Sequence, residues 1–154
     1  SFYINPSSSE VEAALESWHW LPIHSKQPIL VTAFGDIFLE GDGGIWFLDT
    51  LEGELNKVAS NKDELDGVLA TEDGESRFLL SGFVERAHRE ELTLSDGQCF
   101  SFKTAPVAGG AIEFENIEPR NFVVAVNLAG QLHSQAKGWP TGFRVSGFAV
   151  EYED

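Results

Sequence analysis

Six carboxylates lie within nineteen consecutive positions, residues 36–54, with no basic residue among them. Crowding of like charges raises the free energy of the unbound protein, so either solubility or a binding partner must account for it. A nuclease that grips DNA presents lysine and arginine, and an acidic surface could occupy the same groove. We therefore predict that these side chains form a surface for a basic partner protein. They are Asp36, Glu40, Asp42, Asp49, Glu52 and Glu54.

A second pair of carboxylates, Glu113 and Glu115, has a spacing that could support acid–base chemistry. We expect residues 111–117 to form a strand, on which positions two apart share a face with Cα atoms about 7 Å apart. That separation overlaps the range of inverting glycosidases. Glutamates alternate far more often on the wet face of a strand, so we predict no catalytic centre. The alternative is a cleft that uses Glu113, Glu115 or His133 for hydrolysis or small-molecule binding.

The sequence predicts neither a metal ion nor a cofactor. The turn around Asp42 lacks the regular ligand spacing of a calcium loop. Cys99 is the only cysteine, which excludes an internal disulfide and a multi-cysteine zinc site. We expect Cys99 to be a buried small residue in a strand. The histidines show no spacing typical of a metal site. They are His19, His24, His88 and His133.

The acidic stretch must be positioned by β-strands. Residues 32–59 read as three strands joined by glycine-rich turns, with residues 31–34 leading in. Gly41-Asp42-Gly43-Gly44 is typical of a tight turn, because glycine reaches positive φ without steric cost. The segment Ile45–Leu48 is apolar at every position, as expected for a strand covered on both faces.

Helices are expected to supply that cover. Ser9 and Glu12 predict the capping box of a first helix that ends near Trp18. Further helices are predicted from residue 60, over about 75–90, and over 120–137 after Pro119, although residues 122–126 would also suit a strand. Additional strands are expected over 98–103, 111–117 and 143–150. The core is predicted to contain Ile45, Phe47, Leu79, Phe83, Phe100, Phe102 and Leu132.

This pattern predicts an α+β fold: one domain with a mainly antiparallel sheet, an N-terminal meander and helices packed on it. Residues 1–26 form an N-terminal lead and helix, and residues 27–154 form the α+β domain. The length of 154 residues fits one compact unit.

Charge narrows the class of partner. The net charge is −15, and the first 76 residues hold 15 of the 25 acidic side chains but only three of the ten basic ones. Such a field repels nucleic acid and anionic membranes and speeds association with a basic protein. No apolar run approaches the roughly 18 residues of a membrane span. With a single cysteine and no leader sequence, we expect a soluble protein of the cytoplasm.

Three stretches resemble one bacterial domain: TAFGDIFLEGDGGIWFLDTLEGELNKVA, GQCFSFKTAPVAGGAIEFENIEPRNF and NLAGQLHSQAKGWPTG. This is the C-terminal domain of immunity proteins that neutralise DNase toxins delivered by type VI secretion. The resemblance covers about residues 30–140. It implies a cytosolic, non-enzymatic protein that binds a toxin and blocks it.

The leading interpretation is therefore a protein-binding module: an immunity-type inhibitor of a secreted antibacterial toxin, with a basic nuclease as one candidate. An enzyme with its chemistry in a cleft, and a small-molecule or structural module of the same fold, are the other hypotheses. A deep pocket lined by convergent titratable groups would favour the enzyme. The sequence leaves the oligomeric state open.

Overall fold

The computed structural model describes residues 1–137 and shows the predicted α+β fold on an antiparallel sheet. Among these residues, five strands follow one another across the main sheet in sequence order, each antiparallel to its neighbour. They are β1 (Tyr3–Ile4), β2 (Gln27–Thr32), β3 (Ile37–Gly41), β4 (Gly44–Asp49) and β5 (Glu54–Ala59). Strands β6 (Gln98–Phe102) and β7 (Ile117–Asn121) form a two-stranded sheet. The strand expected over 143–150 lies outside the described residues.

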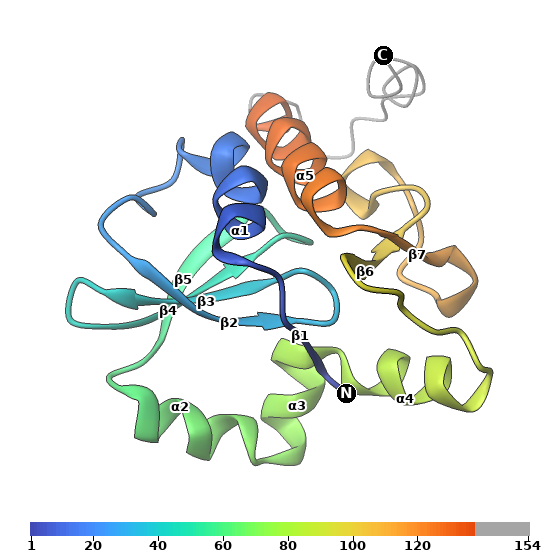
Figure 1. The fold of residues 1–154 in the computed structure, drawn as a ribbon, viewed down its shortest axis with the longest axis horizontal. Helices are drawn as coiled ribbons and strands as arrows, with labels where there is room; N and C mark the ends of the chain where they lie inside the picture. The colour runs from blue at the N-terminus through green and yellow to red at the C-terminus, as the bar shows by residue number, and fades with distance from the viewer. Residues whose placement is uncertain (138–154) are drawn as a thin grey trace.

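Helices cover both faces of the main sheet (Figure 1). α1 and α5 lie on one face and α2 and α3 on the other, while α4 and the two-stranded sheet lie at one side. The helices are α1 (Ser8–Leu15), α2 (Lys62–Leu69), α3 (Glu72–Leu79), α4 (Ser81–Arg89) and α5 (Phe122–Ala136). Short 3-10 turns span Glu16–Trp18, Pro106–Ala108 and Phe114–Asn116.

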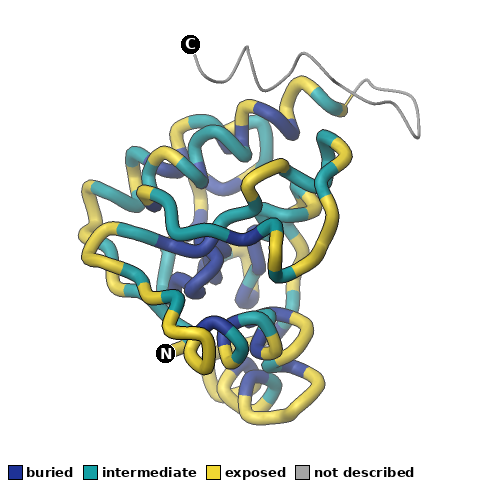
Figure 2. Tube along the Cα trace, turned by 90° about the vertical axis from the view of Figure 1, so that its right-hand side faces the viewer, coloured by how far each residue is buried: buried dark blue, intermediate teal, exposed yellow. Residues whose placement is uncertain are grey.

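The alternation of side chains along β3 explains why both faces need cover. Ile37 and Leu39 pack with residues of α1 and α5, whereas Phe38 packs on the opposite face against α2 and α3. The fully buried Trp18 donates its Nε1–H to the carbonyl of Val126 at 2.8 Å and joins the end of the α1 segment to α5. Figure 2 shows the buried residues gathered between these layers.

The predicted glycine-rich turn joins β3 to β4. Gly41 lies opposite Gly44 in the ladder, which leaves a two-residue loop. Asp42 has φ +50° and Gly43 has φ +82°. Two successive positive φ angles match the twist of the flanking strands, as in a type I′ hairpin.

The N-terminal elements differ from prediction in two places. Of the segment 31–34 that leads into the meander, residues 31 and 32 end strand β2, and residues 33 and 34 lie in the turn that follows. The first helix starts at Ser8, and its capping box uses Ser7 and Glu10 in place of Ser9 and Glu12. Ser7 precedes the first helical residue, so its hydroxyl can accept the N–H of Glu10 at 3.2 Å.

The helix predicted over 75–90 is two helices. α3 begins at Glu72, because the hydroxyl of Thr71 accepts the N–H of Gly74 at 3.0 Å and caps it. Leu80, with φ +51°, ends α3, and α4 leaves in a new direction. Left-handed backbone at a leucine costs about 1–2 kcal/mol. A glycine here would have indicated a helix end in the sequence, but the residue is leucine.

The strand predicted over 111–117 is wrong for residues 111–116, which form bends and a 3-10 turn. Asn116 explains this: its side-chain amide donates to the carbonyls of Thr104 and Ala111, and its Oδ1 accepts from Thr104 N. These bonds give the backbone an alternative to a ladder. Glu113 and Glu115 therefore lie in a loop, not on one face of a strand.

Pro119 lies in β7 and not at the start of a helix. It pairs with Phe100 in the ladder. The N–H of Phe100 points away from β7 and donates to the carbonyl of Ala33 at 2.8 Å, so no bond between these two residues requires the N–H that proline lacks. Asn121 then caps α5, accepting the N–H of Val124 at 3.0 Å. The helix predicted over 120–137 is confirmed, with its start two residues later.

Most of the predicted core is buried. Among the seven residues, Phe83 and Phe102 are only half-buried, because they pack in the peripheral cluster between α4 and the two-stranded sheet. Cys99 is fully buried in β6, as predicted.

Candidate functional site

The structure divides the six acidic residues between the two ends of the main sheet. Glu40 and Asp42 lie at the β3–β4 hairpin, whereas the other four lie at the opposite end, where β3 begins and β4 turns into β5. The six residues of β4 separate the two groups by about 17 Å. The second group, which we call the acidic turn, consists of Asp36, Asp49, Glu52 and Glu54.

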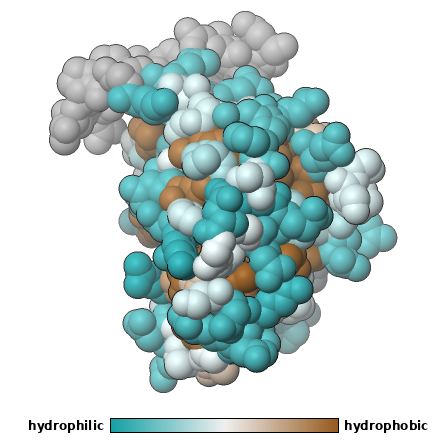
Figure 3. All heavy atoms as spheres, turned by 90° about the vertical axis from the view of Figure 1, so that its left-hand side faces the viewer, coloured by the Kyte–Doolittle hydropathy of each residue, from teal (hydrophilic) through white to brown (hydrophobic). Residues whose placement is uncertain are grey.

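Basic residues offset the charge at the hairpin end. Asp42 Oδ2 accepts from Lys26 Nζ and Ser25 Oγ, both at 2.7 Å, and these bonds lower the pKa of Asp42. The side chain of Lys26 is buried and also donates to the carbonyl of Pro22. Glu40 lies 3.7 Å from the ammonium of Lys62. The surrounding face, drawn in Figure 3, is mainly hydrophilic with small hydrophobic areas between.

Asp36 lies inside the acidic turn, with only 4% of its surface exposed. Its Oδ1 accepts both the N–H of Thr50 at 2.8 Å and the hydroxyl of Thr50 at 2.6 Å. Burial, together with the neighbouring charge of Asp49, raises the pKa of Asp36 to about 7, although the hydrogen bonds oppose the shift. Asp36 is thus a half-ionised carboxyl near neutral pH.

The rest of the acidic turn is organised around Asp49. Its Oδ1 accepts the N–H groups of Leu51 and Glu52, each at 3.0 Å, and so shapes the β4–β5 connection. Burial raises the pKa of Asp49. Burial and the charges of Asp49 and Glu54 also raise the pKa of Glu52, whose side chain is exposed at the surface.

α5 holds this turn through His133. The imidazole Nε2 lies 3.0 Å from the carbonyl of Thr50, and burial lowers the pKa of His133. Gly53, with φ +72°, packs directly on the ring, where even one methyl group would overlap it. The strand end, the turn and α5 therefore form one packed assembly.

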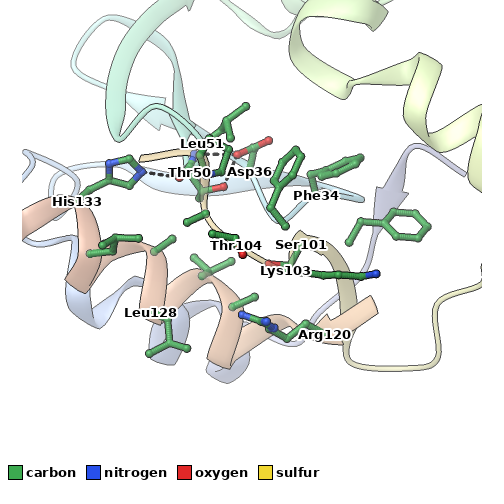
Figure 4. A pocket seen from close by; sticks show the side chains of 18 of the residues that line it. Phe34, Asp36, Thr50, Leu51, Ser101, Lys103, Thr104, Arg120, Leu128 and His133 are labelled. Atoms are coloured by element: carbon green, nitrogen blue, oxygen red, sulfur yellow. Dashed lines mark hydrogen bonds between the residues drawn. The ribbon is translucent and has the colours of Figure 1, made fainter. Parts of the chain in front are cut away.

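A cavity of about 430 Å³ lies under the acidic turn, between α5 on one side and β6 with the connection that follows it on the other. Figure 4 shows Asp36 and Thr50 on one side of it, with Leu128 and Arg120 across from them. Apolar side chains make up most of the wall. Its polar members include Asp36, Thr50, Ser101, Lys103, Thr104, Arg120 and His133.

Of the residues weighed for a hydrolytic cleft, only His133 lines the cavity. Glu115 is on the surface, where it accepts from Arg86 at 3.0 Å, and Glu113 is exposed in the same loop. The structure therefore does not bring the three residues together. His19, His24 and His88 are exposed.

Within residues 1–137, no group of three His, Cys, Asp or Glu side chains is arranged to hold a metal ion. Over the same residues, no helix has the length and apolar character needed to cross a membrane.

Sequence reasoning missed the cavity, although it named Asp36 and His133 separately. These two residues are almost one hundred positions apart, and only the packing of α5 beneath the β4–β5 turn brings them to one wall. One usable signal was Asp36 itself, a charged residue that directly precedes the apolar run Ile37–Leu39.

Solved structures include one with a similar fold. It is the crystal structure of Atu4351 from Agrobacterium tumefaciens, at a TM-score of 0.54 and 16% sequence identity. The match covers 84% of this chain and 65% of that one, so this chain spans less than two thirds of its length. At this identity the likeness shows the fold alone. Comparison with curated proteins gives no match.

A family model described as T6SS immunity protein Tdi1, C-terminal, matches residues 59–133. The matched segment runs from the last residue of β5 to His133 and includes Arg120 and the β6 wall of the cavity. The resemblance to the C-terminal domain of type VI secretion immunity proteins is thus confirmed over residues 59–133, which match the model of the Tdi1 family.

Proposed function

We propose that this protein is a non-enzymatic immunity protein that binds a secreted antibacterial toxin in the cytoplasm and blocks it. The match of residues 59–133 to the Tdi1 C-terminal family carries this proposal. In this role the protein needs a stable, complementary surface and no catalytic centre. The family match supports a protein partner, and the charge distribution supports its chemistry.

The proposed partner is basic, because the chain carries a net charge of −15. A nuclease fits this description, since its DNA-binding groove presents cations that an acidic surface can occupy in place of phosphates. The same charge disfavours nucleic acid and anionic membranes as partners of the immunity protein.

The six acidic residues remain the proposed contact set, and the four residues of the acidic turn are the stronger candidates. At the hairpin, Asp42 is paired with Lys26, and Glu40 lies near Lys62. Within residues 1–137, neither Glu52 nor Glu54 forms an ion pair with a basic side chain. Uncompensated surface charge attracts a basic partner over a longer range than charge already paired.

The test uses a candidate toxin of a type VI secretion system, sought among the genes that neighbour this one. Binding is measured by biolayer interferometry at low and high salt, and protection is measured by co-expression of toxin and protein in a susceptible strain. The double variant Glu52→Gln/Glu54→Gln should associate several-fold more slowly at low salt and lose much of its salt dependence. The control Glu40→Gln/Asp42→Asn removes equal charge at the other end and should change the rate less.

Two outcomes count against the proposal. Absence of both binding and protection by the wild-type protein would refute the immunity function. Equal association rates and salt slopes for the wild type and Glu52→Gln/Glu54→Gln, with circular dichroism unchanged, would instead move the contact surface away from the acidic turn.

A further inference from the structure

The cavity under the acidic turn contains one deeply buried charged side chain, and it is acidic. Asp36 is 4% exposed and forms no ion pair within residues 1–137. The two basic side chains of the wall do not compensate it: Arg120 donates to Glu118 at 2.8 Å, and Lys103 is exposed. A buried carboxylate without a counter-charge is costly, so a cation is what this cavity lacks.

The apolar and aromatic walls of the cavity suit the uncharged part of a lysine or arginine side chain. Phe34 packs against both Phe100 and Phe102, with ring centroids 5.6 and 6.0 Å away. Aromatic faces attract cations, and apolar walls accept the aliphatic stem of lysine or arginine. α5 contributes Leu128 and Leu132 to the wall, and Figure 4 shows Leu128 across the cavity from Phe34. At about 430 Å³ the cavity is within the range of ligand-binding pockets.

The cavity is also reachable from outside. It is partly open to solvent, and exposed residues contribute to its wall: Lys103 and Thr104 after β6, and Val124 on α5. Val124 is 48% exposed, one of two large apolar side chains that reach this exposure among the described residues. An exposed apolar residue beside an open cavity is typical of a surface that a partner covers.

We propose that this cavity receives a lysine or arginine side chain of the toxin, with its charge placed against Asp36. The proposal rests on the immunity function and identifies a specific anchor within it. The acidic turn attracts the basic partner, and the cavity fixes its register through one buried charge pair. Such buried, central contacts supply much of the affinity of protein interfaces, whereas rim charges mainly affect the association rate.

Binding of a cation at Asp36 should depend on pH, because only the ionised carboxylate attracts it. With a pKa of about 7, affinity should rise roughly tenfold between pH 6 and pH 8. Burial lowers the pKa of His133 and raises that of Cys99 to about 12, so both shifts are away from pH 7. The other charged groups around Asp36 are Asp49, Glu52, Glu54, Lys103 and Arg120.

The central experiment measures toxin affinity for wild type and Asp36→Asn at pH 6, 7 and 8. Asparagine keeps an oxygen for the two Thr50 donors, removes the charge and replaces the other carboxylate oxygen with an NH2 group. Affinity at pH 8 should fall about 30-fold or more, as for other buried charge pairs that lose one partner, and its rise with pH should disappear. Arg120→Gln is the matched control, because it removes a charge from the opposite wall.

A double-mutant cycle then identifies the anchor. Lysines and arginines of the toxin are replaced one at a time by glutamine. One of them should weaken binding to the wild type but have almost no further effect on binding to Asp36→Asn. Whether that residue is lysine or arginine decides between an ammonium and a guanidinium group.

The outcomes distinguish a failure of the immunity function from a failure of the anchor at Asp36. If the wild-type protein fails to bind the toxin, the proposed function falls and the anchor with it. If the wild type binds but Asp36→Asn keeps the same affinity, the anchor is wrong and the immunity function stands. The same conclusion follows if wild-type affinity is flat from pH 6 to pH 8, a measurement that needs no variant. Weaker binding by Arg120→Gln alone would mean that the cavity receives an acidic group.

Discussion

Substitution of Gly53 by alanine should destabilise the protein more than the same change at Gly43. Both glycines lie in hairpin turns with left-handed backbone, φ +72° at Gly53 and φ +82° at Gly43. A Cβ atom at Gly43 would meet nothing within 4 Å. At Gly53 it would lie within 2.5 Å of Cγ of His133. The pair therefore separates backbone strain from contact with α5.

The magnitude follows from these two terms. Left-handed backbone costs an alanine about 1–2 kcal/mol, which is the whole expected effect at Gly43. At Gly53 the imidazole must also move, which breaks its hydrogen bond to the Thr50 carbonyl, worth about 0.5–1.5 kcal/mol. Repacking a crowded site adds about 1–3 kcal/mol. We expect Gly53→Ala to cost roughly 2.5–6.5 kcal/mol in total, on the sum of these ranges.

Urea denaturation followed by tryptophan fluorescence measures both free energies of unfolding. The cycle is completed with His133→Ala, which removes the ring. In that background Gly53→Ala should cost no more than Gly43→Ala does in the wild type. Equal costs for Gly43→Ala and Gly53→Ala in the wild type would refute the packing of the β4–β5 turn against α5.

Two further predictions concern stability. Ser7→Ala should lower the free energy of unfolding by about 1 kcal/mol in urea denaturation, because Ser7 caps α1. Ser9→Ala should lower it much less. A larger loss for Ser9→Ala would mean that Ser9 is the cap, as predicted from the sequence. Asp36 has a pKa raised from 3.8 to about 7, so the folded protein holds a proton that the unfolded chain releases between pH 4 and pH 7. Wild-type stability should therefore fall relative to Asp36→Asn across that range and level off above it; a constant difference from pH 4 to pH 8 would contradict the shift.

The meander was predictable because its signals are local. Gly41 to Gly44 announces the hairpin, and the apolar run Ile45–Leu48 indicates a strand covered on both faces. The places of the acidic residues in the fold were harder to predict, because residues close in sequence can lie at opposite ends of an extended strand. In an antiparallel hairpin Asp42 and Asp49 end up at opposite ends of β4, although they are only seven positions apart.

The cavity could not be predicted from local pattern, because its walls come from segments distant in sequence. Asp36 precedes β3, Phe100 lies in β6 and His133 lies on α5. Side-chain hydrogen bonds also overrode the periodicity at residues 111–116, where Asn116 binds Thr104 and Ala111. Alternation of apolar and acidic residues there looked like a strand, but it says nothing of such competing bonds.

The contact between α1 and α5 bears on how the chain folds during synthesis. The hydroxyl of Ser17 donates to the carbonyl of Asn127 across 110 positions, and Gly130 on α5 leaves room for Ser17 to approach its backbone. Strands β2 to β5 pair with near neighbours and can form soon after they leave the ribosome. The apolar sheet face that α5 covers then remains without that helix until more than sixty further residues have been synthesised. At about 5–20 residues per second that interval lasts several seconds. During it, the exposed apolar face is available to aggregate with other nascent chains on the same mRNA.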